Sequence, residues 1–121
     1  MTTLIKNGTI ITAADTYRAD ILVKNGRVSE IGREISKSAN EIIDATGKWV
    51  LPGAVDAHTH LGALCDGMAS ADDFESATAA AAAGGTTTVI DYAEQAPGGT
   101  LLAALEEWKG KGAGRSVVDY A

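Results

Sequence analysis

The sequence predicts an α/β protein in two parts, with a β-rich segment over residues 1–51 and an alternating β-α-β-α-β segment over residues 52–121. In the first part, short β-prone runs are separated by Asn-Gly turn signals. In the second part, stretches of helical pattern alternate with β-branched runs. Strands that alternate with helices in this way form a parallel sheet with right-handed crossovers.

Six short runs in the first part are rich in aliphatic and β-branched residues and are predicted to be strands. They cover residues 4–5, 9–12, 21–23, 27–31, 41–43 and 48–51. Lys6-Asn7-Gly8 and Lys24-Asn25-Gly26 are predicted hairpin turns, because Asn-Gly tolerates the positive φ angles of a type I′ turn. A further turn is predicted at residues 44–47. We expect a small sheet or half of a sandwich that serves as a scaffold, since no cluster of reactive side chains falls in it.

Three strands and two helices are predicted after the pattern changes at Pro52-Gly53. The strands cover residues 54–58, 86–92 and 116–120, and the helices cover residues 70–83 and 100–111. Ser70 and Thr100 are the predicted N-caps, and Gly84-Gly85 ends the first helix. The last strand ends the chain without a cap or polar tail, so we expect a truncated chain. A length of 121 residues also excludes a closed eight-stranded (β/α) barrel.

The composition limits the classes of function. Hydrophobic residues make up 45% of the chain and charged residues 21%, which indicates a globular protein. The formal net charge of −6 and the lack of a Lys/Arg cluster argue against a nucleic-acid partner. No run approaches the roughly 20 apolar residues of a membrane span, and no signal-peptide pattern opens the chain. The single cysteine excludes an intrachain disulfide, which favours the cytoplasm.

The chemistry of the second part centres on the only two histidines, His58 and His60. Residues i and i+2 of a strand point to the same face, so both imidazoles share a face with Asp56. They fall at the carboxyl end of the first parallel strand, where β/α folds place their sites. Two imidazoles so placed can bind one divalent cation. A packed or exposed histidine pair without a metal is the alternative that spacing alone leaves open.

A catalytic zinc ion takes three protein ligands, so further ligands are needed. The nearby candidates are Asp56, Cys65, Asp66 and Asp91. Cys65 also suits a small buried or loop residue, and Asp66 a loop or a helix cap. Asp91 is expected at the end of the second strand, facing the same mouth, either as a functional group or as a structural one. Trp49 and Trp108 are predicted to be core or domain-junction residues.

Several motifs together resemble the opening of the amidohydrolase superfamily. They are Asn7-Gly8, Lys24-Asn25-Gly26-Arg27, residues 43–48 (IDATGK) and residues 50–61 (VLPGAVDAHTHL). Residues 70–76 (SADDFES) and 83–91 (AGGTTTVID) narrow the resemblance to the hydantoinase and dihydropyrimidinase branch. The resemblance extends over essentially the whole chain.

The resemblance implies an α/β fold built from two incomplete domains. Residues 1–51 would be the N-terminal part of a β-sandwich domain, and residues 52–121 the first β-α-β-α-β units of a metal-dependent hydrolase TIM (β/α)8 barrel. In the intact protein, His58 and His60 would ligate the more buried of two divalent ions, expected to be zinc. The family's bridging carboxylated lysine, remaining histidines and catalytic aspartate belong to later strands. No catalytic residue is therefore expected in this stretch.

The resemblance also implies an activity. Enzymes of this branch hydrolyse the ring amide of dihydropyrimidines or hydantoins to N-carbamoyl amino acids, and the expected assembly is a homotetramer that takes a small cyclic amide. The chain alone is expected to be inactive. Two alternatives remain: a non-catalytic dihydropyrimidinase-like interaction protein, such as the collapsin response mediator proteins, and a stand-alone α/β binding module. Retention of His58 and His60 favours the enzyme, because a non-catalytic relative has no metal to hold.

Overall fold

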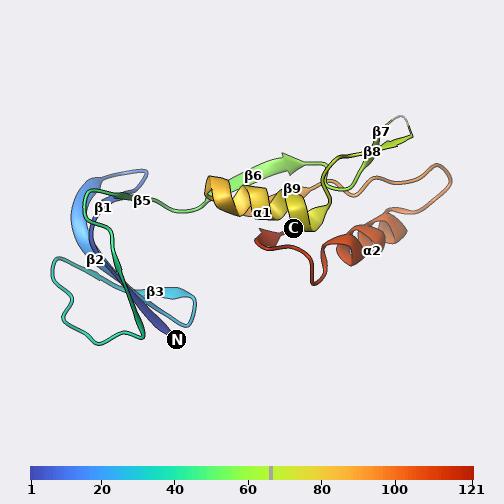
Figure 1. Ribbon diagram of the computed structural model, residues 1–121. Helices are drawn as coiled ribbons and strands as arrows, with labels where there is room; N and C mark the ends of the chain where they lie inside the picture. Colours follow the sequence, from blue (N-terminus) through green and yellow to red (C-terminus); the bar gives the residue numbers. More distant parts are fainter. Residues whose placement is uncertain (66) are drawn as a thin grey trace. The chain divides into compact units, whose positions relative to one another are not determined.

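The structure is a computed structural model that describes residues 1–65 and 67–121, with the side chain of Cys65 left outside the description. The chain divides into two compact units, Met1–Pro52 and Gly53–Ala121, each with its own sheet (Figure 1). Neither of the two helices in the described part of the chain is long and apolar enough to cross a membrane.

The first unit is a five-stranded mixed sheet. Its strands are β1 (Thr2–Ile11), β2 (Thr16–Lys24), β3 (Arg27–Gly32), β4 (Glu41–Asp44) and β5 (Trp49–Val50), with β3-β2-β1-β4 in order and β5 beside β1. The hairpin neighbours β1–β2 and β2–β3 are antiparallel, whereas β4 and β5 both pair parallel to β1. Two buried clusters hold the sheet, one of Leu4, Leu22 and Ile35 and one of Ile10, Ala19 and Ile21.

The predicted hairpin turn at Lys6-Asn7-Gly8 is wrong, because β1 runs straight through these residues. The pairing of β1 with β2 shifts register here, and Asn7 has a φ of 63°, which is the geometry of a β-bulge. The Asn7 N–H donates to the buried Asp20 carboxylate at 2.9 Å. A Cβ at Gly8 would lie 2.6 Å from the Val50 side chain, so the bulge also needs glycine there.

The second Asn-Gly signal is a hairpin turn, as predicted. Asn25 and Gly26 separate β2 from β3 and have φ angles of 51° and 74°. Both positive angles match the type I′ geometry that suits the twist of a hairpin. The same dipeptide therefore has two different structural roles in one sheet.

The second unit confirms the β-α-β-α-β alternation. It contains β6 (Ala54–Thr59), a short hairpin of β7 (Leu64–Cys65) and β8 (Met68–Ala69), α1 (Phe74–Gly84), β9 (Thr86–Asp91), α2 (Leu101–Gly112) and β10 (Asp119–Tyr120). The strands β6, β9 and β10 form a parallel sheet in the order β10-β9-β6. The β7–β8 hairpin was not predicted, because two-residue strands carry no detectable periodicity.

The first helix begins later than predicted. Its N-cap is Asp73 and not Ser70, because the capping box pairs Asp73 with Ser76. Hydrogen bonds from the Ser76 backbone N–H and hydroxyl lower the pKa of Asp73. The predicted C-cap is confirmed, since Gly85 has a φ of 91°, and Thr100 caps α2 as expected.

Candidate metal site

The end of β6 brings His58 and His60 together at the carboxyl edge of the parallel sheet. Their Nε2 atoms lie 3.1 Å apart, and their ring centroids lie 5.1 Å apart. Two nitrogen ligands of one tetrahedral zinc ion lie about 3.3 Å apart, given Zn–N distances of about 2.0–2.1 Å. The spacing of the two Nε2 atoms therefore fits two ligands of a single divalent ion. Both side chains are exposed, so the site is open to an entering ion.

A carboxylate orients one of the two imidazoles. The Nδ1 atom of His60 lies 3.3 Å from Oε1 of Glu94, in the segment that follows β9. This partner favours the tautomer that carries its proton on Nδ1, which leaves the Nε2 lone pair available to a metal. No sequence pattern had pointed to Glu94, which lies in a loop.

An aromatic ring covers both imidazoles. The Tyr92 ring centroid lies 4.6 Å from that of His58 and 5.5 Å from that of His60, and it stacks on His60 with an interplanar angle of 23°. The Tyr92 N–H donates to the Thr59 carbonyl at 3.3 Å, which ties the end of β9 to the end of β6. Stacking of this kind restricts the rotamers that the two histidines can adopt. Tyr92 had been expected only as the last residue of a strand.

The further ligand candidates have different positions. The Asp56 carboxylate accepts the His58 N–H at 3.2 Å, so it faces the backbone of its own strand. Asp66 and the Cys65 side chain lie outside the described residues. Across residues 1–65 and 67–121, no group of three His, Cys, Asp or Glu side chains is placed to hold a metal. The described part of the chain therefore offers two ligands.

Asp91 has a structural environment. Its carboxylate accepts hydrogen bonds from the Thr59 hydroxyl, the Leu61 N–H and the Trp108 indole N–H at 2.9 to 3.2 Å. These donors come from β6, from the residue after His60 and from α2. Of the two roles that the sequence left open for Asp91, the geometry favours the structural one. Trp108 is buried as predicted, whereas Trp49 is 74% exposed and is not a core residue.

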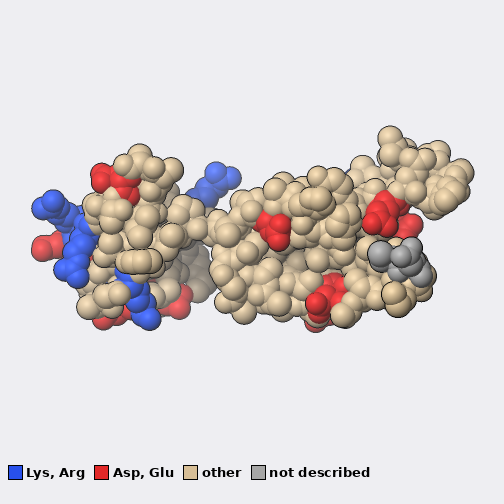
Figure 2. All heavy atoms as spheres, turned by 90° about the horizontal axis from the view of Figure 1, so that it is seen from above, with Lys and Arg blue, Asp and Glu red and all other residues tan. Residues whose placement is uncertain are grey.

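Charge is distributed unevenly between the two units. Residues 1–52 hold seven of the ten Lys and Arg, and residues 53–121 hold ten of the sixteen Asp and Glu. In Figure 2 the basic side chains accordingly gather on the first unit, and acidic side chains are spread over the second. The histidine pair belongs to the acidic unit, whose negative potential favours a cation.

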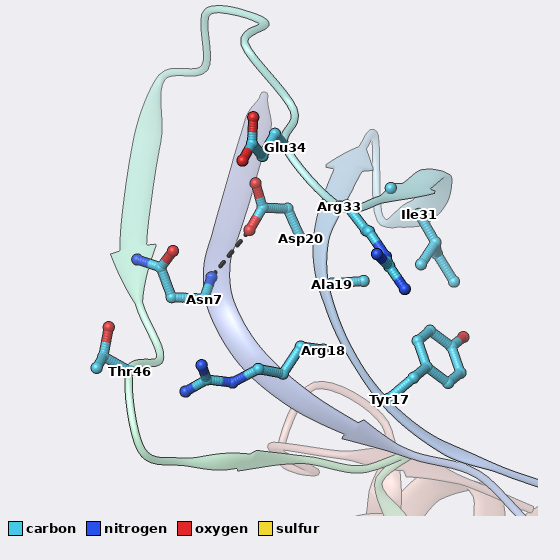
Figure 3. Close-up of a pocket in the computed structure, with 10 residues that line it drawn as sticks. Asn7, Tyr17, Arg18, Ala19, Asp20, Ile31, Arg33, Glu34 and Thr46 are labelled. Carbon is cyan, nitrogen blue, oxygen red and sulfur yellow. Dashed lines mark hydrogen bonds between the residues drawn. The ribbon is translucent and has the colours of Figure 1, made fainter.

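A cavity of about 890 Å³ lies in the first unit, beside Asp20, Arg18, Arg33 and Glu34 (Figure 3). Its buried carboxylate, Asp20, already accepts hydrogen bonds from the Asn7 and Ile35 N–H groups and lies 3.9 Å from the Lys6 ammonium. The lining contains no histidine or cysteine. We assign the candidate site to the histidine pair, because converging ligand atoms define a site more specifically than cavity size does.

The fold and the site define a β/α protein with an imidazole pair suited to a metal ion at the carboxyl end of its first parallel strand. Residues 49–114 match the amidohydrolase family, which is more than half of the chain, and the protein belongs to that family. Members of the family, hydantoinases among them, are generally metal-dependent.

The similar proteins are hydantoinases and dihydropyrimidinases. The chain is 52% identical to a D-hydantoinase of Geobacillus stearothermophilus over 99% of its own length and 26% of that protein. It is 40% identical to dihydropyrimidinase 2 of Caenorhabditis briggsae, over 99% of this chain and 23% of the relative. The chain thus spans about a quarter of the length of these relatives and corresponds to their N-terminal part.

Solved structures agree over the same stretch. A D-hydantoinase crystal structure matches with a TM-score of 0.96 and 49% identity, over 100% of this chain and 26% of the other. The dihydropyrimidinase of Brevibacillus agri NCHU1002 matches with a TM-score of 0.96 and 42% identity, over the same shares. The predicted α/β fold class is therefore confirmed: a five-stranded sheet is followed by a β-α-β-α-β unit, and the chain matches the N-terminal part of hydantoinases, which are TIM-barrel amidohydrolases.

Proposed function

We propose that this chain is the N-terminal part of a metal-dependent cyclic amidohydrolase of the hydantoinase and dihydropyrimidinase type, in which His58 and His60 ligate one divalent ion. The observation that carries the proposal is the 3.1 Å separation of the two Nε2 atoms at the end of β6. The identity to D-hydantoinases over nearly the whole chain supports it. We assign zinc as the ion and two ions to the intact enzyme.

The domain assignment belongs to the same proposal. Residues 1–51 contribute to a β-sandwich domain, and residues 52–121 to the metal-dependent hydrolase barrel. We further propose a homotetramer that acts on a small cyclic amide. We also propose a cytoplasmic location, because the single cysteine of residues 1–121 leaves no disulfide to form within this stretch.

The proposed reaction adds water across the ring amide of a hydantoin or dihydropyrimidine. The hydroxyl group of water adds to the carbonyl carbon, the ring C–N bond breaks, and the leaving nitrogen takes a proton, which produces an N-carbamoyl amino acid. When bound, divalent ions supply Lewis-acid polarisation and lower the pKa of water. His58 and His60 hold the ion through Nε2, Glu94 keeps the His60 proton on Nδ1, and Tyr92 restricts both rings.

Two protein ligands are too few for a catalytic zinc site, which takes three together with water. The resemblance to hydantoinases implies that the remaining ligands and the catalytic aspartate come from the part of the enzyme that the chain does not span. The 121-residue chain by itself is expected to show no hydrolysis of hydantoin or dihydrouracil with added zinc. A rate above that of its His58→Ala/His60→Ala variant would contradict this expectation.

The ligand assignment is tested on the complete protein that carries this chain. Zinc content per chain is measured by inductively coupled plasma mass spectrometry for the wild type, for His58→Ala/His60→Ala and for Glu107→Ala, an exposed control on α2. We expect the double variant to lose at least one ion per chain and to lose hydantoin and dihydrouracil hydrolysis, while Glu107→Ala keeps both. Unchanged zinc content in the double variant would refute the assignment. A zinc-loaded wild type that hydrolyses neither ring would favour the non-catalytic interaction protein.

A further inference from the structure

Three hydrogen-bond donors from two segments, the end of β6 and α2, meet at the Asp91 carboxylate. The Leu61 N–H lies 3.0 Å from Oδ1 and 3.2 Å from Oδ2, and the Trp108 Nε1–H donates to Oδ2 at 2.9 Å. The Thr59 hydroxyl lies 2.9 Å from Oδ1, with the Ile90 carbonyl at 3.1 Å as an alternative acceptor. One side chain at the end of β9 thus joins β6 to α2.

The two donors at the end of β6 flank His60 in the sequence. Thr59 is the residue immediately before His60, and Leu61 is the residue immediately after it. Bonds on both sides restrict the backbone torsions at His60, and these torsions set the direction of its Cα–Cβ bond. The distance from the His60 Nε2 to the His58 Nε2 depends on that direction.

We propose that Asp91 is a positioning residue that holds the His60 imidazole in metal-binding geometry, and that Trp108 on α2 holds Asp91 in turn. The inference rests on the proposed metal role of the histidine pair. Groups that hydrogen-bond to a metal ligand fix its orientation, and their loss lowers metal affinity by about 10- to 100-fold. Here the partner acts on the ligand's backbone and not on its ring.

The carboxylate is required because it has only acceptor atoms. An asparagine at position 91 would keep one acceptor oxygen, and its NH2 group would face either the Trp108 N–H or the donors from β6. A donor that faces a donor forces one of the groups to move. Trp108→Phe keeps a buried aromatic ring but removes the indole N–H together with part of the ring volume, so it weakens the same arrangement from the α2 side.

The test compares Asp91→Asn and Trp108→Phe with two matched controls in the complete protein. Trp49→Phe makes the same chemical change at an exposed indole. Val89→Ala removes buried volume from the same strand as Asp91, where Val89 is 2% exposed, and leaves the Asp91 hydrogen bonds in place. The readouts are the zinc dissociation constant from chelator competition, the visible absorption spectrum of the cobalt(II)-substituted protein, and amide hydrogen exchange of Leu61 in the metal-free protein.

We expect Asp91→Asn to weaken zinc binding by about 10-fold or more, to change the cobalt(II) bands and to accelerate Leu61 exchange. Trp108→Phe should shift all three readouts in the same direction by less. Trp49→Phe should match the wild type, and Val89→Ala should lower the melting temperature while it retains zinc affinity and the cobalt(II) spectrum.

Each outcome separates the positioning role from the ligand assignment. Wild-type zinc affinity and cobalt(II) bands in both Asp91→Asn and Trp108→Phe would overturn the positioning role. An equal loss of affinity in Val89→Ala would overturn it as well, because general destabilisation would then explain the effect. If Asp91→Asn does not fold, Trp108→Phe decides the question alone. Retention of zinc by His58→Ala/His60→Ala would instead refute the proposed function, while Leu61 exchange would still report whether Asp91 restrains the end of β6.

Discussion

Asp20 is a buried charge whose removal has a calculable effect on the first unit. The residue is 2% exposed, and its two carboxylate oxygens accept the Asn7 N–H at 2.9 Å and the Ile35 N–H at 3.0 Å. Burial raises the pKa of Asp20, but these two hydrogen bonds and the nearby Lys6 ammonium together lower the pKa to below its ordinary value. The carboxylate thus ties the β1 bulge to the segment that follows β3.

The perturbation is Asp20→Asn, which preserves the size of the side chain. The amide has one acceptor oxygen, so it satisfies either the Asn7 N–H or the Ile35 N–H and turns its NH2 group toward the other. Loss of a hydrogen bond to a charged group costs about 1.5–3 kcal/mol, and a buried N–H left without an acceptor costs about 1–3 kcal/mol. Because these two costs overlap, we expect the free energy of unfolding to fall by about 2–4 kcal/mol at pH 7.

Urea denaturation followed by circular dichroism measures this difference, with Glu34→Gln as the control. Glu34 lines the same cavity as Asp20 (Figure 3), and its side chain is exposed. The Glu34→Gln variant should therefore have the same urea midpoint as the wild type. Equal midpoints for the wild type and Asp20→Asn, or an equal loss in Glu34→Gln, would refute the reasoning.

The effect of Asp20→Asn should also depend on pH. The pKa of Asp20 is lowered in the folded state, so its contribution is present above the unfolded value of about 3.9 and is lost as pH falls through the folded value. The difference in free energy of unfolding between the wild type and Asp20→Asn should therefore reach its full size at pH 7 and should decrease below about pH 4. A gap that stays constant down to pH 2 would show that the charge of Asp20 is not what stabilises the unit.

Three glycine substitutions provide further predictions. Gly53→Ala should lower the melting temperature, because the added Cβ would clash with the Thr87 side chain. A second change, Thr87→Gly, should restore part of the loss, and no restoration would exclude this clash as the cause. Gly85→Ala should lower the free energy of unfolding by about 1–2 kcal/mol, because φ is 91° at this helix C-cap. Gly110→Ala inside α2, where a Cβ meets open space, should stabilise the protein by about 0.5–1 kcal/mol, and urea midpoints that shift in the same direction for both variants would contradict this account.

The sequence alone determined the features that depend on neighbouring residues. The β-α-β-α-β alternation, the Asn25-Gly26 turn and the Gly85 cap follow from side-chain periodicity and from backbone angles that few residues tolerate. The same holds for the placement of His58 and His60 on one face at a strand end, because the two-residue period of a strand is a local property. These signals were enough to indicate the family.

Only the tertiary structure decided how distant segments use those features. Asn7-Gly8 is a bulge and not a turn because β1 pairs with β2 both before and after it, with β4 before it and with β5 after it, a pairing that no local pattern encodes. Asp91 binds Leu61 and Trp108, which lie 30 and 17 residues away, and Glu94 reaches His60 from 34 residues away. Local periodicity sets which way a side chain points, whereas its partners depend on which elements pack together, and that is known only once the sheet and its helices are assembled.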